Sequence, residues 1–373
     1  MSFMQIHSQL RDYAVHWEQD GRFVHGLEHF SQRLVVVDEN VWRCHRHGCL
    51  GRLDRDQVTL FAVSEERKNL EGVSELYDVL IQRAAKKNVT LVVYGGGILQ
   101  DVAGFVASTL YRGIPWVFVP TTLLAQADSC IGSKTSLNYK GIKNLLGTFN
   151  PPQAVYIHTP FLLTQRDADY YSGLGEVIKL HIMGGADTTD ALVQLLPGLR
   201  ARDLAALETA VQNSLAIKHS YFAGDEFDTG RRNLLNYGHC FGHALEATSG
   251  FRIPHGQAVV FGMLCANIVA VERGVLSAEL ADRLADDLLL PGLHATVTPE
   301  DLDPQALVAA MGKDKKRTGQ GLALVMLGDG FALQRISDLT PVEVETAIAA
   351  FSKWAQRQFS KEALHDCQST HVG

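Results

Sequence analysis

The chain has 373 residues, of which 46% are hydrophobic, and a formal net charge of −7. A single core stops growing near about 250 to 300 residues, so this length predicts two domains. The acidic balance argues against nucleic acid or an anionic membrane surface as a partner, because both are bound by a basic excess. With neither a run of roughly 18 apolar residues nor the apolar core of a signal peptide in the sequence, we expect a soluble cytoplasmic protein without membrane spans.

Short β-branched runs alternate with helical stretches from about residue 33 to residue 160. The runs are RLVVVDEN, DQVTLFAV, VTLVVYGGG, PWVFVPTT and AVYIHT. Such alternation is typical of parallel strands joined by crossover helices. The predicted fold class is therefore α/β, with a Rossmann-like NAD-binding domain over residues 1–160.

Amphipathic stretches replace the strands after residue 160, around 203–221, 231–248, 256–273 and 341–358. Pro151, Pro152 and Pro160 punctuate the change, because proline breaks helices and central strands. We expect a mainly α-helical C-terminal domain over residues 161–373 that binds metal and substrate.

Six cysteines are scattered along the chain, which is not the density of a disulfide-stapled domain. We interpret them as free thiols. The segment from Cys44 to Cys49 offers four potential zinc ligands but lacks the paired spacing of structural zinc sites.

Three glycines, Gly95 to Gly97, follow the run that ends at Tyr94 and precede a helical segment. Glycines at a helix N-terminus let the backbone approach a diphosphate closely. A plain strand-to-helix turn is the alternative, because the GxGxxG fingerprint is absent. Ligands of open α/β sheets bind at the carboxyl edge of the strands, where four polar residues also fall: Asp38, Asn40, Thr121 and Thr122.

Polar side chains recur along Arg231 to Ala247, RRNLLNYGHCFGHALEA. On a helix, Arg232, Asn236, His239 and His243 would fall within about 60° of one another, as one stripe. A solvated face usually mixes Lys and Glu, so this stripe favours the wall of a site. Two histidines four residues apart are weak evidence for a metal on their own.

Further metal ligands are available in two other segments. Glu176 and Lys179 share one face of SGLGEVIKL, and His255 follows Pro254 at a helix start. One Glu with two His is a usual catalytic zinc set that leaves positions open for substrate. The alternative for Glu176 is a solvated helix residue, but its apolar neighbours favour burial, and a buried carboxylate needs a partner.

Cations also occur in apolar or glycine-rich surroundings, where they suit phosphate. Surface lysines are the plain alternative for each one alone. The cations are Lys134, Lys143, Lys179, Lys218, Arg232 and the run Lys313 to Arg317 around Lys315.

Several ordered blocks resemble the sugar-phosphate cyclase family, and within it most closely the 3-dehydroquinate synthases. The resemblance covers about Asp38 to Lys316. The blocks are GGGILQDVAGFVASTLYRG, VPTTLLAQADSCIGSKTSLN, KNLLGTF, SGLGEVIK, DEFDTGRRNLLNYGHCFGHALE, HGQAVVFGM and KDKK.

The resemblance implies a role for each matched residue. Glu176, His239 and His255 would bind zinc or cobalt, and Arg112 would reach the phosphate in the neighbouring subunit of a homodimer. NAD would be bound by Asp38, Asn40, Glu65, Lys68, Gly96, Gly97, Asp101, Thr121, Thr122, Phe161 and Thr164. The pocket of a small sugar-phosphate substrate would be lined by Asp128, Lys134, Lys143, Asn144, Lys179, Lys218, Arg232, Asn236, His243 and Lys315.

The implied activity is that of a lyase, which converts 3-deoxy-arabino-heptulosonate 7-phosphate to 3-dehydroquinate and phosphate. The steps are transient oxidation by NAD, phosphate elimination, re-reduction and an intramolecular aldol closure. Asn236 and His243 keep the dehydroquinate synthase form.

Four features depart from the common synthase pattern: GSKTSLN, GTFNPP, Cys240 and Gln257. They leave open a cyclase of secondary metabolism, either a valiolone type acting on sedoheptulose 7-phosphate or an aminodehydroquinate synthase. A metal-dependent polyol dehydrogenase and a non-catalytic sugar-phosphate-binding protein are the rival classes, because fold resemblance alone does not prove activity.

Overall fold

The structure is a computed structural model that describes residues 2–21, 23–27, 32–83, 86–312 and 321–353. The chain forms two compact units, the first made of Met1–Gly173 and Leu195–Arg232, the second of Leu174–Gln194 and Asn233–Gly373. The sequence predicted one boundary near residue 160, whereas the chain passes between the units three times. The return to the first unit arises because helix α7 (Leu204–Phe222) packs against the turn η6 (Ala125–Ser129).

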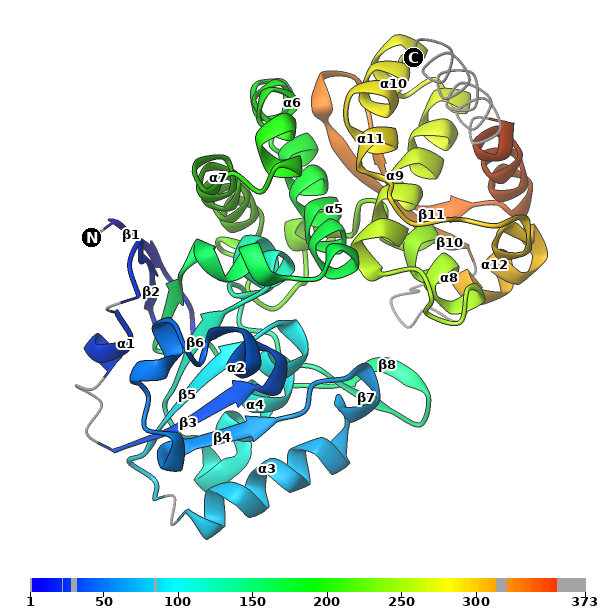
Figure 1. The fold of residues 1–373 in the computed structure, drawn as a ribbon. Coiled ribbons are helices and arrows are strands. Elements are labelled where there is room, and N and C mark those ends of the chain that lie inside the picture. Colours follow the sequence, from blue (N-terminus) through cyan, green and yellow to red (C-terminus); the bar gives the residue numbers. More distant parts are fainter. Residues whose placement is uncertain (1, 22, 28–31, 84–85, 313–320, 354–373) are drawn as a thin grey trace, which may run out of the picture. The chain divides into compact units, whose positions relative to one another are not determined.

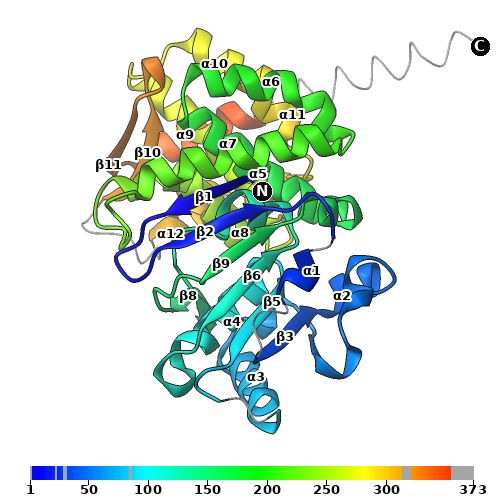
Figure 2. The same ribbon diagram turned by 90° about the vertical axis from the view of Figure 1, so that its left-hand side faces the viewer.

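A seven-stranded sheet is the framework of the first unit, with the strand order β1-β2-β9-β6-β5-β3-β4 (Figures 1 and 2). All five predicted strands are confirmed, and they run parallel: β3 (Arg33–Asp38), β4 (Val58–Phe61), β5 (Thr90–Gly95), β6 (Trp116–Pro120) and β9 (Ala154–Ile157). The sequence did not predict β1 (Ser2–Ile6) and β2 (Tyr13–Trp17), which pair antiparallel at one edge.

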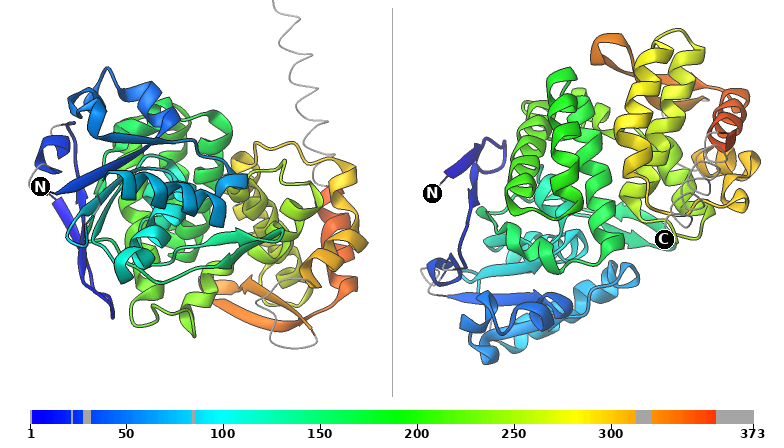
Figure 3. Two further views of the ribbon diagram at one scale, coloured as in Figure 1. Left: turned by 90° about the horizontal axis from the view of Figure 1, so that it is seen from below. Right: turned by 45° about the horizontal axis from the view of Figure 1, so that its top comes forward.

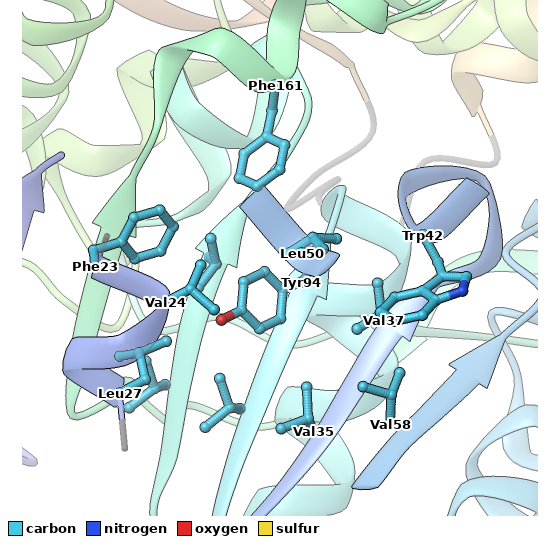
Figure 4. Close-up of a cluster of buried hydrophobic side chains, with 13 residues drawn as sticks. Phe23, Val24, Leu27, Val35, Val37, Trp42, Leu50, Val58, Tyr94 and Phe161 are labelled. Carbon is cyan, nitrogen blue, oxygen red and sulfur yellow. The ribbon is translucent and has the colours of Figure 1, made fainter. Parts of the chain in front are cut away.

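The two faces of this sheet are both buried. Successive side chains of a strand point to opposite faces, so Val35 and Val37 join one cluster while Val36 is buried on the other face. Over the first face lie α1 (Phe23–Gly26) and α2 (Glu39–His45), with a cluster that includes Phe23, Leu27, Trp42, Leu50, Tyr94 and Phe161 (Figure 4). Helix α4 (Gly97–Thr109) packs on β5 and β6, and α3 (Leu70–Gln82) packs on α4.

The strand order places a topological switch point between β3 and β5. The chain continues from β3 to β4 on one side and then returns to β5 on the other side of β3. Connections on opposite sides leave a crevice at the carboxyl ends of the two strands, where open α/β sheets bind ligands. Asp38 ends β3 and Gly95 ends β5, so both lie at this point.

The second unit is mainly helical, as predicted. It contains α8 (His239–Thr248), α9 (His255–Glu272), α10 (Ala278–Leu284), α11 (Leu290–Gly292) and α12 (Pro304–Gly312). The hairpin β10 (Leu322–Leu327) and β11 (Leu333–Leu339), orange in Figure 3, was not predicted. Strand β10 packs against α9 and α8. Helix α9 is long and apolar enough for a membrane span, but 78% of it is buried in the structure, as in the core helix of a globular unit.

Four further parts of the chain connect or extend the units. Helix α5 (Asp167–Met183) and helix α6 (Ala186–Arg200) each run from one unit into the other. The short hairpin β7 (Leu137–Tyr139) and β8 (Ile142–Leu146) belongs to the first unit, and residues 341–353 are helical in the second. The rest of the predicted helix 341–358 lies outside the described residues.

The single helix predicted over 231–247 is wrong. A 3₁₀ turn, η8 (Arg231–Asn236), ends before Gly238, which precedes α8 with φ 77°. A Cβ on Gly238 would lie 2.6 Å from the Val259 carbonyl oxygen, so only glycine allows α8 to start this close to α9. Arg232 and Asn236 therefore do not continue the face of the helix that carries His239 and His243.

The α8–α9 contact yields a stability prediction. A Cβ on Gly262 would lie 1.8 Å from the Gly238 carbonyl oxygen, which is backbone and cannot rotate away. We expect Gly262→Ala to lower the free energy of unfolding by about 3 kcal/mol, as overpacking does. Denaturant titration of Gly230→Ala is the control, since the nearest atom to that Cβ is Asp225 Oδ2 at 3.5 Å. Equal stability of the two variants would contradict the close packing.

Candidate functional site

Two close backbone contacts in the second unit bring three helices together. A Cβ on Gly175 would lie 2.2 Å from the Gly256 carbonyl oxygen, so α5 touches the start of α9 without an intervening side chain. The neighbouring residues Glu176 and His255 consequently face each other. The α8–α9 contact adds His239 from the first turn of α8.

Glu176, His239 and His255 converge as predicted. Oε1 of Glu176 lies 3.2 Å from Nε2 of His255 and 3.7 Å from Nε2 of His239. The ligand atoms of the three residues all lie within 4.8 Å of one another. A cation with bonds of about 2.0 to 2.2 Å to each atom fits this spacing.

The chemistry of these side chains also fits a divalent cation. Glu176 is 1% exposed, and neither of its carboxylate oxygens receives a hydrogen bond of good geometry from the described residues, although the Lys179 ammonium lies 2.5 Å away. Nδ1 of His239 lies 3.1 Å from the Tyr237 carbonyl oxygen and donates to it, which leaves the Nε2 lone pair for a ligand bond. Three protein ligands of this type suit zinc or cobalt and leave coordination positions open.

The electrostatics of the three ligands are strongly coupled. Burial raises the pKa of Glu176, but the Lys179 ammonium and the His255 ring outweigh burial and lower it overall. Burial lowers the pKa of His255, yet the neighbouring carboxylates of Glu176 and Glu246 raise it to about 10. Burial, together with Lys179 and the other histidines, lowers the pKa of His239. The carboxylates of Glu176 and Glu246 thus favour positive charge at His255, whereas His239 is kept neutral, as a metal ligand must be.

Glu246 is a residue of this centre that the sequence analysis missed. Its Oε2 lies 3.0 Å from Nδ1 of His255. On α8, Glu246 lies three residues after His243 and seven after His239, so helical spacing could have placed it on the same face. The His243 ring stands 5.2 Å from that of His239 and 5.8 Å from that of His255. Asn236 and His243 line a small pocket together with His239 and Cys240.

The predicted NAD site of the first unit lies at the carboxyl edge of its sheet, where α4 begins. Gly96 precedes this helix without a side-chain cap, and a Cβ there would come within 2.8 Å of Thr122 Cγ2. Uncapped helix N–H groups and the helix dipole favour a diphosphate. Thr121 Oγ1, at the end of β6, is buried without a hydrogen-bond partner among the described residues. Gly96, Gly97, Thr121 and Thr122 thus fit NAD.

Four other predicted NAD residues lie on β3, α2 and η7 (Thr159–Thr164). Asp38 caps α2 by accepting from the Asn40 N–H at 2.8 Å, and burial raises the pKa of Asp38 despite this bond. Phe161 is 1% exposed and its ring packs in the sheet cluster (Figure 4). Thr164 Oγ1 lies 2.8 Å from Nε2 of His45. Their contact with NAD remains a prediction.

The remaining predicted NAD residues form one polar network with two predicted substrate residues. Lys68 Nζ lies 2.6 Å from Asp101 and 2.7 Å from the Asn144 side-chain oxygen. Asp101 also accepts from the backbone and hydroxyl of Ser136, both at 2.9 Å. Lys143 lies 3.9 Å from Glu65. This network ties the β7–β8 hairpin to α4 and to η4 (Glu65–Arg67).

Predicted substrate cations gather in a second part of the first unit. Lys218 Nζ lies 2.6 Å from Asp128, and Lys134 Nζ lies 2.5 Å from Asp228. Arg232 is 5% exposed and donates to the carbonyl oxygens of Gly132, at 2.8 Å, and Glu226.

Asp225, which the sequence analysis also missed, holds the loop that carries Arg232. It accepts from the backbone N–H groups of Thr229, Gly230 and Arg232. Slight desolvation raises the pKa of Asp225, but these hydrogen bonds outweigh it and lower the pKa to about 2. Its Asp-x-x-x-Thr-Gly spacing is a turn signal that could have identified it.

Three sequence predictions stand apart from these sites. Arg112 is exposed in a turn where Tyr111, Arg112 and Gly113 all have positive φ, of 53°, 62° and 117°. Lys315 lies outside the described residues. Among the described residues, neither group that could share a cation includes Cys44 or Cys49.

Solved structures share this architecture. A 2-epi-5-epi-valiolone synthase from Streptomyces hygroscopicus, with NAD⁺ and Zn²⁺ bound, is 25% identical, with a TM-score of 0.80 over 95% of this chain and 99% of that one. A glycerol dehydrogenase from Schizosaccharomyces pombe, 16% identical with a TM-score of 0.59 over 94% and 91% of the chains, shares the fold alone. The fold, the convergent metal ligands and the additional cations Lys134, Lys218 and Arg232 together are those of the sugar-phosphate cyclase class of proteins.

Sequence comparison narrows the class. Profiles of the 3-dehydroquinate synthase N-terminal and C-terminal domains match residues 58–172 and 173–317. A 3-dehydroquinate synthase of Streptococcus pneumoniae is 39% identical over 314 residues, which are 83% of this chain and 88% of the relative. One of Dehalococcoides mccartyi is 36% identical over 263 residues, 70% and 73% of the two chains. The chain belongs to the 3-dehydroquinate synthase family.

The buried hydroxyl of Thr121, in the predicted NAD site, gives a test of NAD binding. Thr121→Val keeps the shape of the side chain and removes a buried hydroxyl that has no partner among the described residues. We expect NAD affinity to fall about fivefold, the value of one hydrogen bond near 1 kcal/mol, while stability is kept or raised. Calorimetric titration should show no such loss for Ser214→Ala, whose buried hydroxyl also has no partner among the described residues. Unchanged NAD affinity in Thr121→Val would remove Thr121 from the site.

Proposed function

We propose that the protein acts as a 3-dehydroquinate synthase, converting 3-deoxy-arabino-heptulosonate 7-phosphate to 3-dehydroquinate and phosphate. The convergence of Glu176, His239 and His255 carries the proposal, because the described residues place three metal ligands of the expected types within 4.8 Å. Membership of the family supports the same reaction.

The chain's own residues bind and orient the substrate. The Gly96 turn and Thr121 would hold NAD, which accepts a hydride from a substrate carbinol and later returns it. Glu176, His239 and His255 would hold the cation, which polarises the vicinal hydroxyls and the aldol carbonyl. Lys134, Lys218 and Arg232 would fix the acidic groups of the substrate by charge-assisted hydrogen bonds. The phosphate's own oxygens can take up the proton, so no dedicated base is required.

Arg232 supports a substrate that carries a carboxylate as well as a phosphate, and therefore the heptulosonate phosphate over sedoheptulose 7-phosphate. Lys218 is already paired with Asp128, whereas the hydrogen bonds found for the Arg232 guanidinium go to neutral backbone carbonyls. Burial lowers the pKa of Arg232, and the nearby carboxylates of Asp228, Asp128 and Glu226 only partly offset this effect. A substrate carboxylate would accept charge-assisted hydrogen bonds from this guanidinium, and sedoheptulose 7-phosphate has no carboxylate to offer.

Two of the departures from the synthase pattern have structural explanations. Gln257 is 1% exposed, donates to the Gly292 carbonyl and accepts from the His294 and Ala295 N–H groups. Its amide holds the backbone of the second unit. Ser133 donates to the buried Glu226 carboxylate at 2.5 Å. Neither contact selects one sugar phosphate over another.

Phosphate release discriminates the substrates directly. With NAD and zinc, we expect release from the heptulosonate phosphate and none from sedoheptulose 7-phosphate. Arg232→Ala should lower kcat/KM for the acid by about 100-fold, since a charge-assisted hydrogen bond contributes about 1.5–3 kcal/mol. Arg231→Ala is the matched control: Arg231 is exposed, stacks on Tyr221 and should change kcat/KM less than about threefold.

The opposite substrate preference would assign a valiolone-type cyclase. Release from neither sugar, with steady NADH formation from a polyol, would instead assign a dehydrogenase.

A homodimer is the second part of the proposal. The resemblance places Arg112 in the neighbouring subunit's site, and the positive φ angles around it commit the backbone to an exposed turn. A cytoplasmic location is proposed as well. It is supported by the free state of the five described cysteines, as expected in a reducing compartment.

Subunit mixing tests the role of Arg112. Arg112→Ala and His255→Ala chains should each be inactive alone. In a coexpressed mixture half the dimers are mixed, and one of their two sites has both residues intact if Arg112 acts across the interface. Activity should therefore recover to about a quarter of the wild-type value for a symmetric dimer. No recovery, or a fully active monomer in sedimentation, would contradict the proposal.

A further inference from the structure

Glu246 lies behind one of the metal ligands. Its side chain extends from α8, is 5% exposed, and places Oε2 3.0 Å from Nδ1 of His255. The other ring nitrogen, Nε2, lies 3.2 Å from Glu176 Oε1 on the opposite side of the ring. The two carboxylates therefore approach the two nitrogens of one imidazole.

We propose that Glu246 is a positioning residue that fixes His255 as a metal ligand. By accepting a hydrogen bond from Nδ1–H, it holds the ring in the tautomer whose Nε2 lone pair faces Glu176. A carboxylate acceptor also makes the opposite nitrogen a stronger donor to a metal. This inference rests on the proposed metal site and names a residue that acts on the cation through His255.

The two histidine ligands are held differently. Nδ1 of His239 donates to a neutral backbone carbonyl, that of Tyr237, at 3.1 Å. His255 faces a buried carboxylate instead. A neutral peptide acceptor polarises the ring less than an anion does, so His255 is the more basic ligand of the pair. Loss of the Glu246 charge should consequently weaken metal binding without removing a ligand.

Glu246, His243 and His255 could also be taken for a second cation site, because their ligand atoms lie within 4.8 Å of one another. Such a site would use Nδ1 of His255, the atom that contacts Glu246 at 3.0 Å. With Nε2 bound to a first cation, Nδ1 could bind a second only if the ring lost both protons. The hydrogen-bonded arrangement avoids that step and leaves Glu246 as an acceptor.

Metal affinity of full-length variants tests the inference. We would measure zinc dissociation constants by competition with a chromophoric chelator for wild type, Glu246→Gln and Glu246→Ala. The expected weakening is about tenfold for Gln and up to about 100-fold for Ala, the range found for outer partners of metal-bound histidines. Bound Co²⁺ should keep a single-site stoichiometry in Glu246→Gln, with a shifted visible spectrum.

Asp301→Asn is the matched control. Asp301 is an equally buried carboxylate of the same unit, 5% exposed, and bonds Arg252 and Thr298 rather than a histidine. We expect its loss to lower the melting temperature and leave zinc affinity unchanged. If Glu246→Gln and Asp301→Asn weaken zinc binding equally, Glu246 has only a structural role and the inference is wrong.

The remaining outcomes separate this inference from the proposed function. If wild type binds no zinc and His255→Ala changes nothing, the metal site itself fails. If wild type binds zinc and Glu246→Gln binds it equally tightly, the inference alone fails. Should the variants not fold, ¹⁵N-histidine NMR of zinc-loaded wild type decides, with His255 assigned by His255→Asn. A proton on Nδ1 supports the inference, and a proton on Nε2 overturns it.

Discussion

The charge of Glu176 is the constraint around which the second unit is built. A carboxylate that is 1% exposed costs several kcal/mol unless positive or hydrogen-bonding groups surround it. Lys179, one turn along α5, supplies one such group, and a cation held together with His239 and His255 would supply the other. The imidazoles of His239 and His255 can reach Glu176 only because Gly175 and Gly262 let α5, α8 and α9 meet at backbone distance. Packing and electrostatics therefore depend on the same contacts.

The strands and metal ligands could be predicted because their signals are local. Each parallel strand is a short β-branched run with turn residues beside it, and burial on both sheet faces needs no long-range information. For the metal ligands, residue chemistry, the apolar segment around Glu176 and the helix start at His255 gave the candidates. The choice of His239 over His243 came from the family resemblance. Helix boundaries were also close where proline or glycine marks them, as at the start of α9 after Pro254.

The missed features depend on contacts between distant segments. Helical spacing over 231–247 is regular, yet the contact of Gly238 with Val259 and Met263 breaks it, and no local signal reports that contact. The return of α7 to the first unit follows from packing on η6, not from composition. Helical spacing places Glu246 on the face of His243, but its role depends on His255, which belongs to another helix, α9. The roles assigned to individual NAD and substrate residues remain predictions.

The fold alone does not separate a cyclase from a dehydrogenase, since a glycerol dehydrogenase shares the architecture at 16% identity. What differs physically is the number of acidic groups that the substrate brings. Oxidation of a polyol needs an NAD site and a metal ion. A phosphorylated acid also needs cationic side chains that are shielded from water. The buried Lys218 and Arg232 in the first unit meet that need, and the exposed Lys134 adds a third cation. Both lysines are paired with aspartates that hold them in place. An aspartate partner fixes each lysine without cancelling its capacity for further hydrogen bonds, because an ammonium has three donors. The paired cations thus remain able to bind an anion while staying ordered in its absence.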